Sequence, residues 1–210
     1  MTRVQSGTRG RIAATPSHLL IFLSDANLQT PVIAPPPTMS KKHPSRVFGH
    51  IPGYNSGHHF EDRRELNASG VHVQVRSGIH GDSSPGGGAF SVCLARDEYE
   101  DDVDYGNKII YVGSGGKDKD TKKQIADQSF DKYPNRALYI SYMTKKPVRV
   151  IRGPDQTNQW APSSGYDYDG LYIVHSATMK RGKAGFNMCF VELRRIDNDD
   201  AQVASSPQEN

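Results

Sequence analysis

Aromatic and acidic side chains concentrate in residues 99–116, whose sequence is YEDDVDYGNKIIYVGSGG. Tyr99 and Asp102 lie at its start, and Tyr111 and Val112 end an apolar, β-branched run that is typical of a short strand. Two tyrosine faces can stack on a planar heterocycle while a carboxylate accepts hydrogen bonds from its amino edge. Cytosine is such a heterocycle, so this stretch predicts a base-binding pocket.

Other interpretations of this stretch stay open from the residues alone. The two tyrosines are compatible with an ordinary core, and the acidic run at 97–104 could hold a divalent cation, although it lacks the loop pattern of a calcium site. Residues 113–117 read GSGGK, but Asp118 stands where a phosphate-binding loop needs Ser or Thr. We expect neither a metal nor a cofactor.

Short strands are expected to position these side chains. Apolar and β-branched runs predict strands at 71–75, 89–95, 108–112, 147–152, 170–175 and 186–193. The first of these alternates apolar and polar residues, as a half-buried strand does. Many short strands with few helices predict an antiparallel barrel or sandwich, of the α+β, mostly β class.

Helices and loops are fewer. Asn135 as a cap, with Pro147 beyond the far end, predicts a helix over 135–143, and the charged stretch at 60–66 predicts at least one further helical turn. The polar, lysine-rich segment after Gly116 predicts an exposed loop of the kind that often carries function.

Composition sets the boundaries of the domain. Residues 1–46 hold six Lys or Arg against one Asp and are rich in Ser, Thr and Pro, which predicts a disordered basic extension. Residues 197–210 hold four acidic residues and no basic one, which predicts an acidic disordered tail. One domain is therefore expected, at 47–196.

Cysteine usage and hydropathy limit the class of protein. Cys93 and Cys189 lie in apolar, strand-like runs, where a thiol behaves as a small buried hydrophobe, so no disulfide is expected. The longest apolar run near the start, residues 19–23, is too short for a membrane span or for the core of a signal peptide. We expect a soluble, intracellular protein with no membrane partner.

A series of motifs in fixed order resembles the SRA domain, also called the YDG domain. The motifs are VFGHIPG (47–53), RREL (63–66), GVHVQV (70–75), SGIHG (77–81), YEDDVDYGN (99–107), YVGSGG (111–116), ADQS (126–129), NRAL (135–138), KPVRVIRG (146–153), YDGLYIV (168–174) and GFNMCFVELRR (185–195). The resemblance implies a curved, partly closed β-barrel with flanking helices. It also implies a domain that binds 5-methylcytosine in double-stranded DNA and flips the base out of the duplex.

The resemblance assigns roles to single residues. Tyr99 and Tyr111 match the two tyrosines that stack on the flipped base, Asp102 the aspartate that takes its amino hydrogens, and Val112 a residue that bounds the methyl group. Positions expected to bind DNA are Arg63, Arg76, Lys117, Lys122, Lys123 and Gln124.

These six positions divide into three roles. Arg63 and Lys117 match phosphate contacts of the family, and Arg76 stands where a loop residue fills the space that the base vacates. The sequence departs from the family at residues 122–124, where Lys-Lys-Gln replaces the Asn-Lys-Arg finger of vertebrate members.

The expected function is that of a non-enzymatic reader of methylated DNA, located in the nucleus, with chromatin proteins as further partners and a monomer as its state. The alternative is a modification-dependent endonuclease, or its specificity subunit, in which the acidic run at 97–104 holds the metal.

Overall fold

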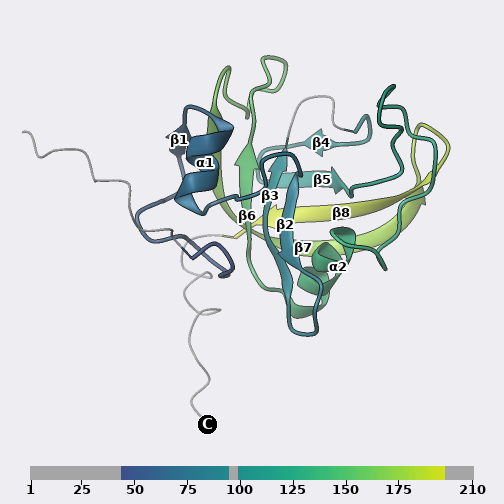
Figure 1. Ribbon diagram of the computed structural model, residues 1–210, viewed down its shortest axis with the longest axis horizontal. Coiled ribbons are helices and arrows are strands. Elements are labelled where there is room, and N and C mark those ends of the chain that lie inside the picture. Colours follow the sequence, from purple (N-terminus) through teal and green to yellow (C-terminus); the bar gives the residue numbers. More distant parts are fainter. Residues whose placement is uncertain (1–43, 95–98, 197–210) are drawn as a thin grey trace, which may run out of the picture. The chain divides into compact units, whose positions relative to one another are not determined.

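A single curved sheet forms the domain in the computed structural model, which describes residues 44–94 and 99–196 (Figure 1). The strands are β1 His58–Phe60, β2 Ile79–Asp82, β3 Gly88–Leu94, β4 Val103–Asp104, β5 Lys108–Val112, β6 Val148–Arg152, β7 Tyr166–Arg181 and β8 Asn187–Arg195. The helices are α1 Arg63–Ser69 and α2 Asn135–Thr144.

The sheet has the order β2-β3-β6-β7-β8-β5-β4, and β1 pairs with β7 beside this path. Its two end strands, β2 and β4, do not pair with each other, so the barrel is open, and the predicted mostly β, partly closed architecture is confirmed. Register shifts interrupt the β6–β7 and β7–β8 pairings, and shifts of this kind bend a strand and increase its twist. The two longest strands, β7 and β8, therefore curve across the domain (Figure 1).

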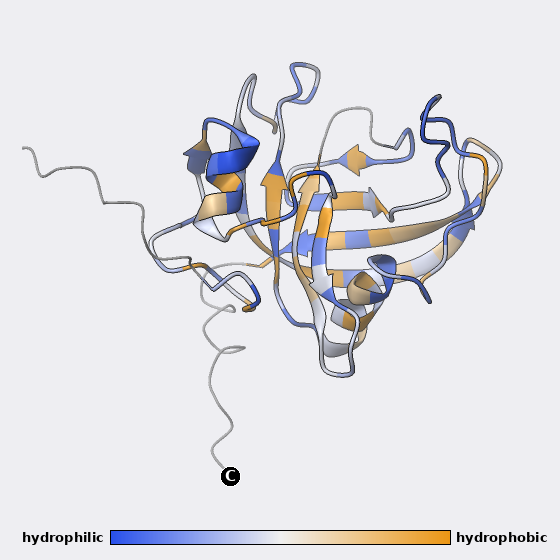
Figure 2. Ribbon diagram, in the orientation of Figure 1, coloured by the Kyte–Doolittle hydropathy of each residue, from blue (hydrophilic) through white to orange (hydrophobic). Residues whose placement is uncertain are grey.

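Two hydrophobic clusters fill the spaces beside the sheet. The larger one lies between the sheet and α2 and contains Ile79, Val92, Ile109, Leu138 and Val191, among others. The smaller one lies around α1 and contains Ile51, Phe60, Leu66, Val71 and Tyr168. Figure 2 shows that apolar residues concentrate in the strands and polar residues in the loops. No helix in the described part of the chain is long and apolar enough to cross a membrane.

Most predicted elements are confirmed, among them the strands at β3, β5, β6, β7 and β8 and the helix α2. Both cysteines are buried thiols, as expected. The predicted extension and tail lie outside the described residues, except for residues 44–46.

Two expectations about strands are wrong. Residues 71–75 form no strand, because side chains rather than a neighbouring strand bind their carbonyl groups: Arg149 donates to the Val71 carbonyl, Asn67 to that of Val73 and Arg63 to that of Gln74. The sheet is also not wholly antiparallel, since β3 and β6 run parallel, with Val92 opposite Val150. Helix α2 lies in the long connection between them in sequence, as a parallel pair requires.

Candidate base-binding site

The strand β5 presents two of the predicted pocket residues, Tyr111 and Val112, at its end. Both side chains are buried, and β8 pairs with this end of β5, with Val191 opposite Tyr111. Gly78 approaches the tyrosine closely, because a Cβ atom at this glycine would lie 2.6 Å from the Tyr111 hydroxyl. The loop that precedes β2 is therefore packed directly against the pocket tyrosine.

The other two predicted residues join the end of β5 through hydrogen bonds. The backbone N–H of Val112 donates to Oδ1 of Asp102 at 2.6 Å, and the N–H of Asp102 donates to the Tyr99 carbonyl at 3.0 Å. A turn thus carries Tyr99 and Asp102, and the carboxylate fastens that turn to the strand. The structure brings Tyr99, Asp102 and Val112 together although up to 13 positions separate them in sequence.

The glycine-rich loop after β5, residues 113–116, and Lys117 beyond it also contact Tyr99. The N–H of Gly115 donates to the Tyr99 hydroxyl at 2.9 Å, and the ammonium of Lys117 lies 3.9 Å from the centroid of the tyrosine ring. An ammonium over an aromatic face is attracted by the ring quadrupole. One face of Tyr99 therefore carries a positive charge.

Two buried amides hold this glycine-rich loop, and sequence reasoning missed both. Asn135, predicted as a helix cap, instead accepts the N–H of Ser114 at 2.7 Å and donates to the Ser114 carbonyl at 2.9 Å. Gln128 donates to the Gly113 carbonyl at 2.6 Å and accepts the N–H of Cys189 at 3.0 Å. The N-cap of α2 is Pro134. An Asn before an apolar run predicts a cap equally well, so the sequence offered no signal for this role.

A cavity of about 520 Å³ lies beside the pocket, between residues 99–104 and the loop at 152–161. Tyr99 and Asp102 line it, together with Trp160, whereas Tyr111 and Val112 do not. The Trp160 side chain is 48% exposed, and its ring covers Gly106, where a Cβ atom would lie 3.1 Å from it. Sequence reasoning gave Trp160 no role.

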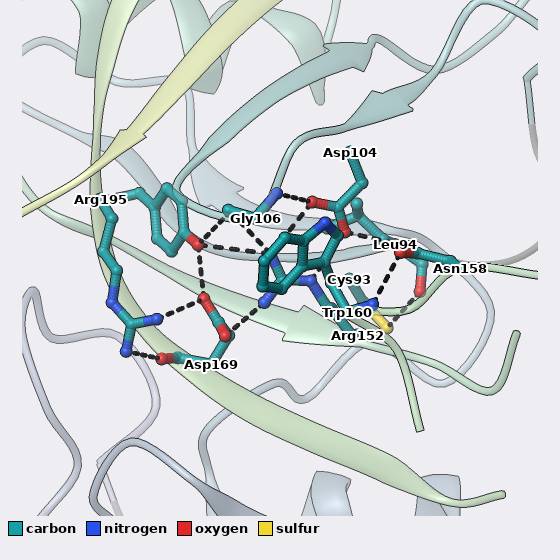
Figure 3. A network of polar contacts seen from close by, with 10 residues as sticks. Cys93, Leu94, Asp104, Gly106, Arg152, Asn158, Trp160, Asp169 and Arg195 are labelled. Atoms are coloured by element: carbon teal, nitrogen blue, oxygen red, sulfur yellow. Dashed lines mark hydrogen bonds and ion pairs between the residues drawn. The ribbon is translucent and has the colours of Figure 1, made fainter. Parts of the chain in front are cut away.

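A buried ion-pair network anchors the strand that follows Asp102 (Figure 3). The Arg152 side chain is 3% exposed, donates to Asp104 at 2.7 Å and pairs with Asp169, the aspartate of the YDG motif. Burial raises the pKa of Asp104, but hydrogen bonds from Arg152 and Asn158 outweigh burial and hold this pKa below its ordinary value. The charged network therefore fixes Asp104, two residues beyond Asp102, to β6 and β7.

The carboxylates of the acidic run that the structure describes point to different partners and do not meet at one site. Asp101 accepts the N–H of Lys183, Asp102 that of Val112, and Asp104 pairs with Arg152. Among residues 44–94 and 99–196, no group of three or more His, Cys, Asp or Glu side chains is placed to hold a metal ion. Positions 97 and 98 of the run lie outside the described residues.

The predicted DNA-binding residues of α1 and the loop after it differ in exposure. Arg63, the first residue of α1, donates to the carbonyls of Gln74 and Ser77 at 3.1 and 3.0 Å and to the Cys93 thiol at 2.6 Å. Arg76 lies exposed in the loop that Arg63 holds. The structure thus places Arg63 beneath the loop and Arg76 on its surface.

The remaining four predicted residues, Lys117, Lys122, Lys123 and Gln124, belong to one closed loop. Lys117 and Gln124 form an isolated β-bridge at its base, and the Gln124 amide donates to the Gly115 and Ala126 carbonyls at 3.0 and 2.7 Å. Lys122 and Lys123 are exposed at the tip. Gln124 is therefore turned toward the base of the loop, away from the two lysines.

Comparison with known proteins gives consistent matches over this domain. Residues 47–199 match the family model of the SAD/SRA domain. A UHRF1-like protein of Cryptococcus neoformans is 41% identical over 74% of this chain, and bovine E3 ubiquitin-protein ligase UHRF1 is 39% identical over 73%. The chain spans 48% of the fungal relative and 22% of the bovine one.

Solved structures give the same result. The modification-dependent TagI restriction endonuclease has a TM-score of 0.71 and 39% identity, with 78% of this chain and 57% of that chain covered. The SUVH5 SRA bound to fully hydroxymethylated CG DNA has a TM-score of 0.61 and 35% identity, with 72% and 95% covered.

Proposed function

The chain belongs to the SAD/SRA domain family, and on this premise we propose that it is a reader of methylated DNA that flips 5-methylcytosine into a pocket of Tyr99, Asp102, Tyr111 and Val112. The hydrogen bond of 2.6 Å between Asp102 and the Val112 N–H carries the proposal. Asp102 would bind the amino group of cytosine. The hydrogen bond joins it to β5, which carries the stacking Tyr111 and, next to the methyl group, Val112.

The contacts of the proposed pocket can supply enough free energy to flip a base out of the duplex. Flipping a base costs a few kcal/mol of unstacking. Stacking contributes about 1–3 kcal/mol per base, and a carboxylate that accepts from the cytosine N4 discriminates by about 1–3 kcal/mol. Together these terms offset the cost of extruding the base.

Lysine and arginine side chains would supply the part of the affinity that does not depend on sequence. We assign this role to Arg76, Lys117, Lys122 and Lys123, and the exposure of Arg76 and the loop-tip lysines supports it. Arg63 and Gln124 act on DNA indirectly in this proposal. Each uses its side-chain donors to hold the loop that carries an exposed cation.

Substitution of Asp102 tests the pocket. Asp102→Ala should abolish the preference for methylated over unmethylated duplex and leave weak, salt-sensitive binding. Asp102→Asn is the matched variant, because its carbonyl can still accept from Val112 while its NH₂ group cannot accept the cytosine amino hydrogens. Both variants should lose the preference in fluorescence-anisotropy titrations, and a folded Asp102→Ala protein with unchanged methyl preference would overturn the assignment.

The wider setting follows from the relatives. Because two relatives are UHRF1 or UHRF1-like proteins, we assign this chain to the nucleus, where it would act as a monomer on chromatin DNA. The ligase activity named for the bovine relative is not assigned here, since the chain spans 22% of that protein.

The similarity to the TagI endonuclease supports a second candidate function, the specificity domain of a modification-dependent nuclease. Incubation of methylated plasmid with the protein and Mg²⁺ or Mn²⁺ distinguishes the reader from the nuclease. Intact plasmid together with binding supports the reader, whereas cleavage that depends on methylation supports the nuclease.

A further inference from the structure

The tip of the β7–β8 hairpin contacts the segment that carries half of the proposed pocket. The backbone N–H of Lys183 donates to both carboxylate oxygens of Asp101, at 3.2 and 3.1 Å, across 82 positions of sequence. The Lys183 ammonium also donates to the Glu100 carbonyl. Residues 100 and 101 lie between Tyr99 and Asp102, so the hairpin holds the turn that presents both.

Gly182 shows how closely the two segments approach. A Cβ atom at this position would lie 2.6 Å from Oδ2 of Asp101 and 2.8 Å from Cγ of Met188. The backbone of Gly182 does not adopt a positive φ, so the lack of space, and not the conformation, accounts for the glycine. The turn itself is closed by its own hydrogen bonds, from Gly182 to the Phe186 carbonyl and from Gly185 to the Gly182 carbonyl, both at 2.9 Å.

The same hairpin also holds the other half of the pocket. Its second strand, β8, pairs with β5 so that Val191 lies opposite Tyr111 and Phe190 opposite Val112. One hairpin therefore supports Tyr111 and Val112 through its strand and Tyr99 and Asp102 through its tip. The contact of Asp101 with Lys183 thus joins the two halves at a second point, beside the hydrogen bond between Asp102 and Val112.

We propose that Asp101 is a positioning residue that sets the spacing of the base pocket by fastening the turn at residues 99–102 to the tip of the β7–β8 hairpin. The proposal rests on the proposed function, because the pocket it positions is the one assigned to 5-methylcytosine. Asp101 itself touches no base in this scheme. It acts through Tyr99 and Asp102, whose placement determines whether a flipped base is stacked and read.

Two variants of equal charge separate positioning from electrostatics. Asp101→Ala removes the acceptor for the Lys183 N–H, whereas Asp101→Asn keeps a carbonyl acceptor, and both remove one negative charge that would repel phosphate. Asp101→Ala should lower the ratio of affinities for methylated and unmethylated duplex by about fivefold, and Asp101→Asn should keep it within about twofold of the wild type. Lys180→Ala, elsewhere on the hairpin, serves as a control that leaves the ratio unchanged.

A measurement on the protein without DNA makes the test independent of the proposed function. Hydrogen–deuterium exchange of residues 99–104 should rise in Asp101→Ala and stay near wild type in Asp101→Asn, while thermal melting confirms that both fold. Gly182→Ala places a methyl group on the hairpin against Asp101 and should push the same two segments apart. It should therefore also lower the affinity ratio and raise the exchange of residues 99–104, as Asp101→Ala does. If Asp101→Ala does not fold, Gly182→Ala and Asp101→Asn provide the comparison.

The outcomes distinguish a failure of the positioning role of Asp101 from a failure of the proposed function. Faster exchange with an unchanged affinity ratio overturns the positioning role, as does a ratio that falls equally in Asp101→Ala and Asp101→Asn. A wild-type protein with no methyl preference overturns the proposed function instead, and the exchange data then still show whether the hairpin holds the turn.

Discussion

The ammonium of Lys117 lies 3.9 Å from the centroid of the Tyr99 ring and covers one of its faces. A base that stacks on Tyr99 must use the opposite face or displace the lysine. The residue expected to bind phosphate is thus also in contact with the residue expected to stack on the base.

Substitution of Lys117 distinguishes these two roles. If the lysine contacts phosphate, Lys117→Ala should weaken binding of methylated and unmethylated duplexes by the same factor and reduce the salt slope by about 1. Lys117→Arg keeps the charge and a cation that can stack on the ring, and should bind as the wild type does. A loss confined to methylated DNA would show that Lys117 acts on the base through Tyr99.

Removal of the Asn135 amide should destabilise the glycine-rich loop and with it the domain. Asn135→Ala leaves the N–H and C=O of Ser114 without their partner in a partly buried site, at a cost of about 1–3 kcal/mol in the free energy of unfolding. Asn135→Asp keeps the acceptor and loses the donor, so its stability in urea titrations should fall between that of the wild type and that of Asn135→Ala. Equal stability of Asn135→Ala and wild type would contradict the role given to this amide.

Acid should destabilise the domain before its carboxylates titrate. Burial lowers the pKa of His72 to about 3 from an ordinary value of 6.5, with the Arg63 charge as a further cause. Between these values the unfolded chain binds a proton that the folded chain does not, so the free energy of unfolding decreases as the pH falls below 6.5. Each pKa unit is about 1.4 kcal/mol, so the full effect is several kcal/mol.

Urea titrations between pH 7.5 and 5 measure this effect in the range where few carboxylates titrate. The His72 ring contacts the Ser91 hydroxyl at 2.8 Å and the Ser77 carbonyl at 3.0 Å. His72→Gln can accept from the hydroxyl and donate to the carbonyl without titrating, so its stability should depend less on pH. Some dependence should remain, because burial also lowers the pKa of His80, to about 4. An unchanged slope in His72→Gln would exclude His72 as the main cause.

The loop at residues 117–124 should read the second DNA strand poorly. Gln124 is held at the base of the loop, and Lys122 and Lys123 are flexible, strongly hydrated cations that favour phosphate over a fixed contact with a base. We therefore expect similar affinities for hemimethylated and fully methylated CpG duplexes in competition titrations. A tenfold preference for hemimethylated DNA, about 1.4 kcal/mol, would show that another residue reads the opposite strand.

The strands β3, β5, β6, β7 and β8 and the helix α2 could be predicted from local patterns, because runs such as KIIYV at β5 carry their preference within a few residues. The short strands β1, β2 and β4 were not predicted. The strand predicted at 71–75 fails for a non-local reason. Its alternation is real, but its carbonyls bind side chains of Asn67, Arg63 and Arg149, and the last of these lies 78 positions from Val71. A local pattern contains no information about such partners.

The candidate site shows the same limit. Asp101, Asp102 and Asp104 look alike in sequence, yet their partners lie 82, 10 and 48 positions away. Only the fold decides that these carboxylates diverge, and this divergence could not be predicted from an acidic run. The tyrosines and Asp102 were predicted from the chemistry of a base pocket and from the family resemblance, and their DNA contacts stay a prediction.

The open ends of the sheet affect how copies of the domain meet. The end strands β2 and β4 contain four and two residues, so each offers a short row of unpaired backbone groups. Short edge strands give a second chain little to pair with, which protects an open sheet against edge-to-edge aggregation. On the proposed function, several copies can therefore bind neighbouring sites on densely methylated DNA without pairing the edges of their sheets.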